Sequence, residues 1–287
     1  MKEFLRLDNK LEIILKIKPM SPLLIKLSTQ EKESKEKTDN YAAFLTTESM
    51  VGRTKLKTND SGDIINDTRE GEIYIPGSSL RGMFRDRSLD ILTENEVDRL
   101  YGKIDEDKGQ KTRIFIEDAY LYELKNREKC YEKNEKKISD IKELIKTRSI
   151  TPIDHFSGKA TVPLKFEYTT ESFFTKITIN NISLKELKSL YFIFRDSKNG
   201  ELRVGNSKTR GFGQVELEID EMIYYKYFGK KELVKDMGKY FKIDENKSIK
   251  IGKNYLCEVL KLEGDKFNNI DIENPNDFIK AIFAEVE

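Results

Sequence analysis

The side chains best suited to contact a polyanion lie together in one short segment, Gly205–Gly213, with the sequence GNSKTRGFG. It holds three glycines, two hydroxyl side chains and two cations within nine residues. Such a loop can wrap a phosphodiester backbone with its amides and cations, although the G-x-x-x-x-G-K-[ST] order of a P-loop is absent. The same composition is typical of a glycine-rich hairpin whose charges face water. Phe212 either stacks on a base or anchors the loop in the core.

A second candidate is the segment Ile75–Gly82, IPGSSLRG, which predicts a tight strand-to-helix turn and then a helix with Ser78 or Ser79 as its N-cap. The start of a helix presents free amides and the positive end of its dipole, and small residues there let a phosphate approach closely. Arg81 and Arg85 lie one helical turn apart, a spacing at which both can hold the same backbone. An ordinary capped helix with surface arginines explains the pattern equally well.

Catalysis by histidine would depend on one residue, because His155 is the only histidine of the chain. A Ser-His-Asp triad would have to include it, and a metal site made of several histidines is excluded. Carboxylates, backbone amides or a bound cation are therefore the expected means of any chemistry. Cys130 and Cys257 form no C-x-x-C pair, which argues against a zinc site and a disulfide framework and fits a reducing cytoplasm.

The bulk composition limits the classes of partner. The 287 residues suffice for one large domain or two small ones with a proper core. Charged residues make up 36% of the chain but the net charge is only +1, so any polyanion site must arise from local placement of Lys and Arg. The longest apolar run, Leu190–Phe194, is too short to span a bilayer, and no apolar signal core begins the chain. We expect a cytoplasmic protein with no membrane partner.

The elements that position these segments follow from the hydrophobic pattern. Apolar runs and alternation predict strands over residues 11–17, 72–75, 112–121, 163–168, 173–179 and within 202–219. Helical spacing predicts one helix from the serine pair to about Leu92 and another over 183–194, with Ser183 as its N-cap. The order strand, helix, strand, strand, helix, strand is that of an α+β, ferredoxin-like or RRM-like core (βαββαβ) with its helices on one face.

Two insertions and an extension complete the expected domain organisation, in which residues 1–227 form the core domain. Residues 28–71 form a long polar N-terminal loop without a sustained period, and such loops are usually functional or disordered. Residues 122–150 form the second insertion, whose highly charged part, 125–147, predicts a solvated helix or helical hairpin. Residues 228–287 predict an α+β C-terminal extension that packs on the core or contacts a neighbouring subunit.

Four of these segments together resemble the RAMP superfamily of CRISPR-associated proteins. IPGSSLRG before a helix and GNSKTRGFGQVEL near the end of the core are similar to the two signature segments of that family. TRIFIEDAYL (112–121), shortly after Leu100-Tyr101-Gly102, resembles the family's strand after an FG turn, and ITPIDHFSGKA (150–160) resembles the I-D-x-x-T-G-x-A segment of type III backbone subunits. The resemblance implies a modified RRM-like fold that lines up on a guide RNA (crRNA) beside copies or paralogues of itself.

The resemblance also implies which residues contact RNA and which one cuts it. Subunits of this type that cleave target RNA carry an Asp before the IPGSS segment, and Asp39 is the closest match, with Asp60, Asp63 and Asp67 as rivals in the same loop. Asp39 would hold Mg²⁺ or another divalent cation at the scissile phosphate, or orient the attacking 2′-hydroxyl. Four solvated carboxylates are the non-catalytic interpretation. The implied RNA contacts are Ser78, Ser79, Arg81, Arg85, His155, Asn206, Ser207, Lys208, Thr209, Arg210 and Phe212.

The function that the resemblance implies is crRNA binding in a multisubunit type III effector complex, with target RNA and other RAMP and large subunits as partners. Parts of the N-terminal loop and the central insertion would reach between guide and target and kink the duplex. A metal-dependent endoribonuclease activity would then cut the target at regular intervals. The alternatives are a non-catalytic structural subunit, such as one that caps the 3′ end of the guide, and a stand-alone endoribonuclease that processes repeat RNA. Enzymes of the last kind often use His, and no histidine lies near the N-terminus.

Overall fold

The computed structural model describes ten stretches of the chain, and the fold is described for these alone: residues 6–27, 41–47, 56–59, 64–67, 71–103, 109–121, 144–160, 162–227, 250–254 and 257–263. Within them no helix has both the length and the apolar character needed to cross a membrane.

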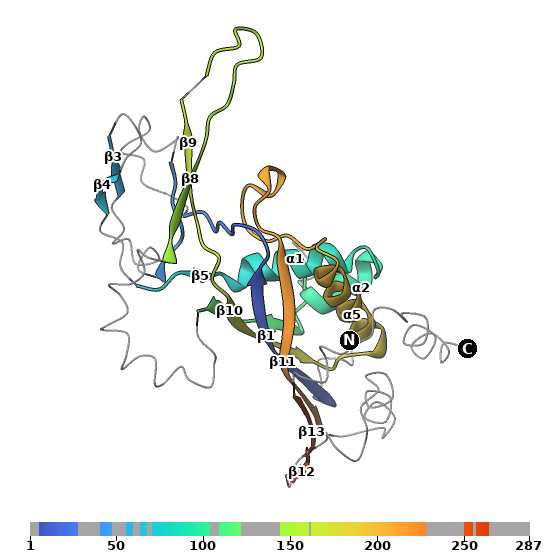
Figure 1. Ribbon diagram of the computed structural model, residues 1–287. Helices are drawn as coiled ribbons and strands as arrows, with labels where there is room; N and C mark the ends of the chain where they lie inside the picture. Colours follow the sequence, from blue (N-terminus) through green and yellow to red (C-terminus); the bar gives the residue numbers. More distant parts are fainter. Residues whose placement is uncertain are drawn as a thin grey trace.

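A large antiparallel sheet is the main feature of the fold (Figure 1). Its strand path is β12-β13-β11-β1-β10-β7-β5, and β6 also pairs with β10. The strands are β1 (Asn9–Pro19), β5 (Tyr74–Ile75), β6 (Ile114–Ile116), β7 (Ala119–Tyr120), β10 (Phe173–Asn180), β11 (Val215–Lys226), β12 (Lys250–Asn254) and β13 (Cys257–Glu263). The helices that pack on it are α1 (Gly77–Ser88), α2 (Glu94–Tyr101) and α5 (Leu184–Lys198).

The four central strands follow one another in the order β11, β1, β10 and β6, and every neighbouring pair is antiparallel. Helices α1 and α2 connect β1 to the β6 region, and α5 connects β10 to β11, so each helical connection passes over one intervening strand. The prediction of a mixed α+β protein with an antiparallel sheet is therefore confirmed.

Strand β1 shows why the sequence forms a two-faced sheet. Its alternate residues Leu11, Ile13, Leu15 and Ile17 are fully or almost fully buried in the core beneath the helices. Burial of each such side chain contributes about 1.5–3 kcal/mol, and a shift of one residue would move all four to the opposite face. The opposite face carries lysines instead, and Lys16 pairs there with Glu218 of β11 at 3.3 Å.

The helices start at positions that the local sequence largely explains. Ser183 caps α5, as predicted, and the structure shows that it also forms a capping box with Glu186. The helix continues to Lys198 rather than stopping at residue 194. Helix α2 was not predicted, although Thr93 and Glu96 form the same capping box there. The prediction of Ser78 or Ser79 as the N-cap of α1 is wrong, because the helix begins at Gly77 and both serines lie inside its first turn.

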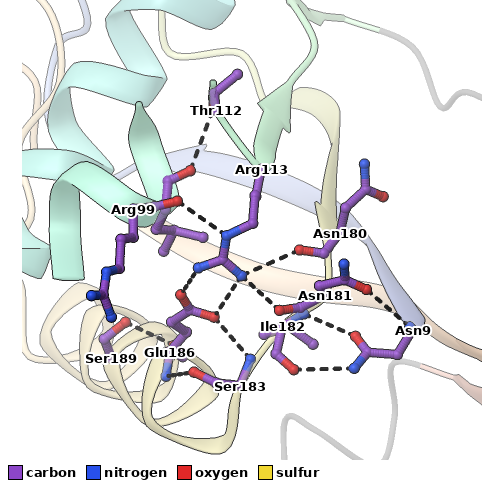
Figure 2. A network of polar contacts seen from close by, with 11 residues as sticks. Asn9, Arg99, Thr112, Arg113, Asn180, Asn181, Ile182, Ser183, Glu186 and Ser189 are labelled. Atoms are coloured by element: carbon purple, nitrogen blue, oxygen red, sulfur yellow. Dashed lines mark hydrogen bonds and ion pairs between the residues drawn. The ribbon is translucent and has the colours of Figure 1, made fainter. Parts of the chain in front are cut away.

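A buried ion pair joins the start of β6 to α5 (Figure 2). The guanidinium of Arg113 contacts the carboxylate of Glu186, and both side chains are buried. Arg113 also donates to the backbone oxygens of Arg99, at 3.0 Å, and Asn181, at 2.6 Å. One side chain therefore holds the end of α2, the turn after β10 and the first turn of α5 together.

A second sheet stands apart from the first and carries a projecting hairpin. It consists of β2 (Tyr41–Ala42), β9 (Leu164–Tyr168) and β8 (Lys146–Ile150), with β8 and β9 antiparallel. Figure 1 shows this hairpin in yellow-green, with its tip extending well beyond the rest of the described chain. Because β8 starts at Lys146, the predicted helix over 125–147 is wrong at its last two residues, and most of it lies outside the described residues.

The two remaining described pieces belong to the N-terminal loop and the C-terminal extension. Strands β3 (Leu56–Thr58) and β4 (Ile64–Asp67) form a two-stranded sheet within the loop. Strand β13 pairs with β11, for example at Leu260 opposite Tyr224, and β12 pairs with β13. The described part of the extension thus widens the main sheet by one hairpin.

Candidate nucleic-acid interface

The glycine-rich loop has a backbone conformation that only glycine accepts at two positions. Gly205 and Gly213 have φ values of +82° and +81°. A Cβ atom would lie 2.3 Å from the Leu24 carbonyl oxygen at Gly205 and 2.1 Å from the Val204 carbonyl oxygen at Gly213. Both glycines therefore allow a tight loop that contacts neighbouring backbone directly.

Hydrogen bonds hold this loop against the segment that follows β1. The amide of Asn206 donates to the Leu24 carbonyl oxygen at 2.8 Å, and its side-chain oxygen accepts from the Lys26 amide at 3.0 Å. The Gly213 amide donates to the Pro22 carbonyl oxygen at 2.8 Å. Asn206, which was predicted to contact RNA, is used here to fix the loop in place.

The cations of the loop lie on a single 3₁₀ turn, η5 (Lys208–Arg210), after Ser207 in a left-handed conformation. Lys208, Thr209 and Arg210 are all exposed. Within the described stretches no carboxylate pairs with Lys208 or Arg210. The turn therefore presents two cations and a hydroxyl to solvent from a rigid base, which suits contacts to a phosphate backbone.

Phe212 anchors the glycine-rich loop in the core, which is the second of the two roles that the sequence predicts for it. Its side chain is 0% exposed, and its ring centroid lies 5.7 Å from that of Phe166 and 6.3 Å from that of Tyr168. A base cannot stack on a ring that is covered in this way. Its assignment as an RNA contact is therefore corrected, and Phe212 anchors the loop to β9.

The first turn of α1 is partly occupied by protein groups. The Gly77 amide donates to a carboxylate oxygen of Asp118 at 2.7 Å, so a side chain already uses the positive end of this helix. A Cβ atom at Gly77 would lie 2.3 Å from the Ile116 carbonyl oxygen, which explains the glycine. Ser78 and Ser79 are exposed beside it.

The two arginines of α1 face α2 rather than forming a common clasp. Arg81 donates to the Tyr101 carbonyl oxygen. Arg85 pairs with Asp98 at 2.9 Å, and Lys103 approaches the same carboxylate at 3.5 Å. Both guanidinium groups tie α1 to α2, which makes them weaker candidates for RNA contacts than the cations of η5.

His155 lies at the tip of the β8–β9 hairpin and is exposed. Its ring meets that of Phe156 edge-on at 5.7 Å, and Phe156 is 96% exposed. Asp154 shapes the turn, because its carboxylate accepts hydrogen bonds from the Ser157 hydroxyl and from the amides of Phe156 and Ser157. These bonds lower the pKa of Asp154. An exposed aromatic side chain on a projecting tip is typical of a contact surface.

The proposed catalytic Asp39 lies outside the described residues, as do Asp60 and Asp63, while Asp67 ends β4. The chain just after Asp39 is firmly held. The carboxylate of Glu167, on β9 and almost fully buried, accepts hydrogen bonds from the Tyr41 hydroxyl and the Phe44 amide. In the part of the chain that the structure describes, no three His, Cys, Asp or Glu side chains are grouped to hold a metal ion.

One residue beside the loop was not predicted from the sequence. Arg148, on β8, is exposed, and its guanidinium carbon lies 5.6 Å from the centroid of the Phe212 ring. The β-branched residues Thr147 and Ile150 favour a strand here. The apolar residues just before this strand, at helical spacing, predict a helix instead: Ile138, Ile141, Leu144 and Ile145.

The fold and the loop define an α+β protein with a cationic glycine-rich loop beside a projecting hairpin. The family model of the RAMP superfamily matches residues 16–216, a stretch that contains both IPGSSLRG and the glycine-rich loop. The chain therefore belongs to the RAMP superfamily.

Individual relatives add little to this assignment. No match was found among curated proteins. The chain is similar to one in the cryo-EM structure of the Type III-B Cmr-beta bound to cognate target RNA, with 15% sequence identity and a TM-score of 0.43. The similarity covers 74% of this chain and 60% of that one, so this chain spans less than two thirds of its length.

Proposed function

We propose that this protein binds crRNA as a RAMP subunit of a type III CRISPR effector complex. The observation that carries the proposal is the η5 turn, where Lys208, Thr209 and Arg210 are exposed and no described carboxylate neutralises the two cations. The turn is held by backbone contacts at both ends, so little conformational entropy is lost when a phosphate binds. Contacts of this kind position a nucleic acid without reading its bases.

The proposed domain organisation is a ferredoxin-like or RRM-like core over residues 1–227, with insertions at 28–71 and 122–150 and an extension at 228–287. The strand order β11-β1-β10-β6 and the two helical connections support it. In this arrangement the glycine-rich loop precedes the last core strand and the hairpin belongs to the second insertion and the segment that follows it.

The hairpin tip is proposed to enter the guide–target duplex. Phe156 is the most exposed large apolar side chain of the described chain, and Ile153 is also 70% exposed. Aromatic side chains on a tip can stack on splayed bases. His155 would contact RNA beside Phe156, which fits its exposed position better than a role in catalysis.

Cleavage of the target is proposed to depend on Asp39, with a divalent cation as cofactor. The support is positional, because Asp39 lies two residues before Tyr41, which pairs with β9 at the base of the hairpin. A non-catalytic structural or guide-capping subunit is the alternative. If this subunit cleaves the target, substitution of Asp39 removes the regularly spaced cuts. If it is structural or caps the guide, the same substitution leaves the cuts unchanged.

Guide binding can be tested with the full chain and a labelled single-stranded RNA of guide length. The Lys208→Ala/Arg210→Ala variant is compared with Lys111→Ala/Arg99→Ala, which removes two exposed cations elsewhere. Loss of two phosphate contacts should lower the slope of log K against log salt by roughly 1.4. An unchanged slope would exclude the loop as the guide site, and absence of RNA binding by the wild type would exclude the function.

Target cleavage is tested separately in the reconstituted complex with Mg²⁺ and a complementary RNA. Asp39→Ala should abolish the cuts made by this subunit while guide binding persists. Unchanged cutting would favour one of the other loop carboxylates or the structural role.

A further inference from the structure

We infer that Arg148 and Arg210 form a single phosphate clamp that links the hairpin to the glycine-rich loop when RNA binds. The inference rests on the proposed RNA-binding function and goes beyond it by adding Arg148, a residue of the hairpin, to the backbone site. It also gives RNA a second role, since one bound strand would reinforce the contact that Phe212 already makes between the loop and β9.

The two guanidinium groups lie on one pair of aromatic rings. The guanidinium carbon of Arg148 is 5.6 Å from the centroid of Phe212, and that of Arg210 is 5.7 Å from the centroid of Phe166. The two rings are themselves in contact, with centroids 5.7 Å apart. Arg148 is also the direct cross-strand partner of Phe166 in the β8–β9 register. Two cations from distant parts of the sequence thus lie over the same pair of contacting, buried rings.

An arginine that lies over an aromatic ring keeps its charge and its hydrogen-bond donors available to a ligand, unlike an arginine that is paired with a carboxylate. Each cation–π contact holds a guanidinium in place by about 0.5–1 kcal/mol at an exposed site. It neither neutralises the charge nor fills the hydrogen-bond donors at the rim of the guanidinium. Arg85 and Arg113 show the contrast, because their charges are paired with Asp98 and Glu186. Arg148 and Arg210 are both exposed and retain their donors for an anion.

The positions of Arg148 and Arg210 show which two elements a bound RNA strand would connect, the hairpin and the glycine-rich loop. Arg210 is on η5, whose flanking residues Asn206 and Gly213 are hydrogen-bonded to the core segment after β1, whereas Arg148 is on the first strand of the projecting hairpin. The hairpin already contacts the loop through Phe166 and Phe212, so a phosphodiester strand that crosses both guanidinium groups would add a second link between them. The tip with Phe156 would then have a defined direction relative to the guide.

The inference is tested by RNA-binding titrations at several salt concentrations, with single-stranded RNA of guide length and the full chain. The variants are Arg148→Ala, Arg210→Ala and the double variant, and Arg99→Ala is the matched control for loss of one exposed arginine. We expect Arg148→Ala to lower the slope of log K against log salt by roughly 0.7, as for one phosphate contact. Arg99→Ala should leave the slope unchanged.

Two further measurements separate a phosphate contact from a structural role. Arg148→Lys keeps the charge and should restore most of the salt slope, although not the full affinity, because lysine lacks the planar fork. Amide hydrogen exchange in residues 146–150 should slow when RNA binds the wild type and should slow less in Arg148→Ala. An Arg148→Ala slope equal to that of the wild type would overturn the clamp, while RNA binding by the wild type would leave the proposed function standing.

Discussion

The guanidinium of Arg113 and the carboxylate of Glu186 form a buried ion pair between the start of β6 and the first turn of α5. Each partner has further hydrogen bonds, since Glu186 also accepts from the Ser183 amide at 2.8 Å and Arg113 donates to three backbone oxygens. The pair therefore connects α2 and α5 to the main sheet. Because both charged groups are buried, protein groups rather than water supply their hydrogen bonds.

Removal of one member of this pair should destabilise the protein strongly. Arg113→Met leaves the Glu186 carboxylate buried without its partner, and the expected loss in the free energy of unfolding is about 3–5 kcal/mol. Urea unfolding followed by circular dichroism measures it. Lys185→Ala is the control, because its ion pair with Glu96 is exposed and should contribute less than about 1 kcal/mol. Equal effects of the two substitutions would contradict the structural role of Arg113.

Two glycine substitutions should have opposite effects on stability. Gly213→Ala places a methyl group 2.1 Å from the Val204 carbonyl oxygen at a φ of +81°, so it should lower the melting temperature and distort the glycine-rich loop. Gly82→Ala adds a methyl group to the interior of α1 with no atom within 4 Å apart from the adjoining helix backbone, and it should stabilise the protein by about 1 kcal/mol. Thermal unfolding of both variants is the measurement, and a stabilised Gly213→Ala would refute the close approach of Gly213 to Val204.

Glu167 should act as a positioning residue for the N-terminal loop. Its carboxylate accepts from the Tyr41 hydroxyl, 126 residues away in the sequence, and from the Phe44 amide at 2.6 Å. Glu167→Gln weakens both bonds while it preserves the shape of the side chain. We expect target cleavage to fall while guide binding and its salt dependence remain, because Asp39 lies just before the anchored segment. A parallel loss of guide binding would indicate a general folding defect instead.

The carboxyl group of Glu96 should titrate well below its usual range. Hydrogen bonds from Lys185, and then from the Thr93 amide and hydroxyl, lower its pKa to about 2. Because the folded-state pKa is depressed, its contribution to stability is present above about pH 4.5 and is lost as the pH falls towards 2. NMR titration of the side-chain carboxyl carbon checks the value. Lys185→Ala should raise this pKa, and an unchanged value would rule out the contact.

The exposed aromatic residue at the hairpin tip should matter for target recognition and not for folding. Phe156→Ala removes a side chain that is 96% exposed, so the free energy of unfolding should stay within about 0.5 kcal/mol of the wild type. Binding of guide alone should be unchanged, whereas binding of the complementary target to the assembled complex should weaken. Thr170→Ala, an exposed substitution near the base of the hairpin, is the control. Equal target affinity of Phe156→Ala and the control would exclude a stacking role.

Local sequence signals were sufficient for the elements whose stability depends on near neighbours. The short apolar run over residues 11–17 predicted β1, and Ser183 as an N-cap predicted the start of α5. Both signals depend on residues that lie close together along the chain. At the border between the charged insertion and β8, helical spacing predicted that the helix continues to residue 147, whereas the structure has a strand from Lys146.

The sequence by itself also determined the family, because IPGSSLRG and the glycine-rich loop are continuous segments. Only the tertiary structure decided which side chains remain available for a ligand. Arg85 and Lys208 look alike as surface cations in the sequence, yet one is paired with Asp98 and the other faces solvent. The tertiary structure likewise decided that Phe212 is buried and that Arg148 lies over its ring. The partner of a side chain is set by contacts between residues far apart along the chain, and no local pattern encodes these contacts.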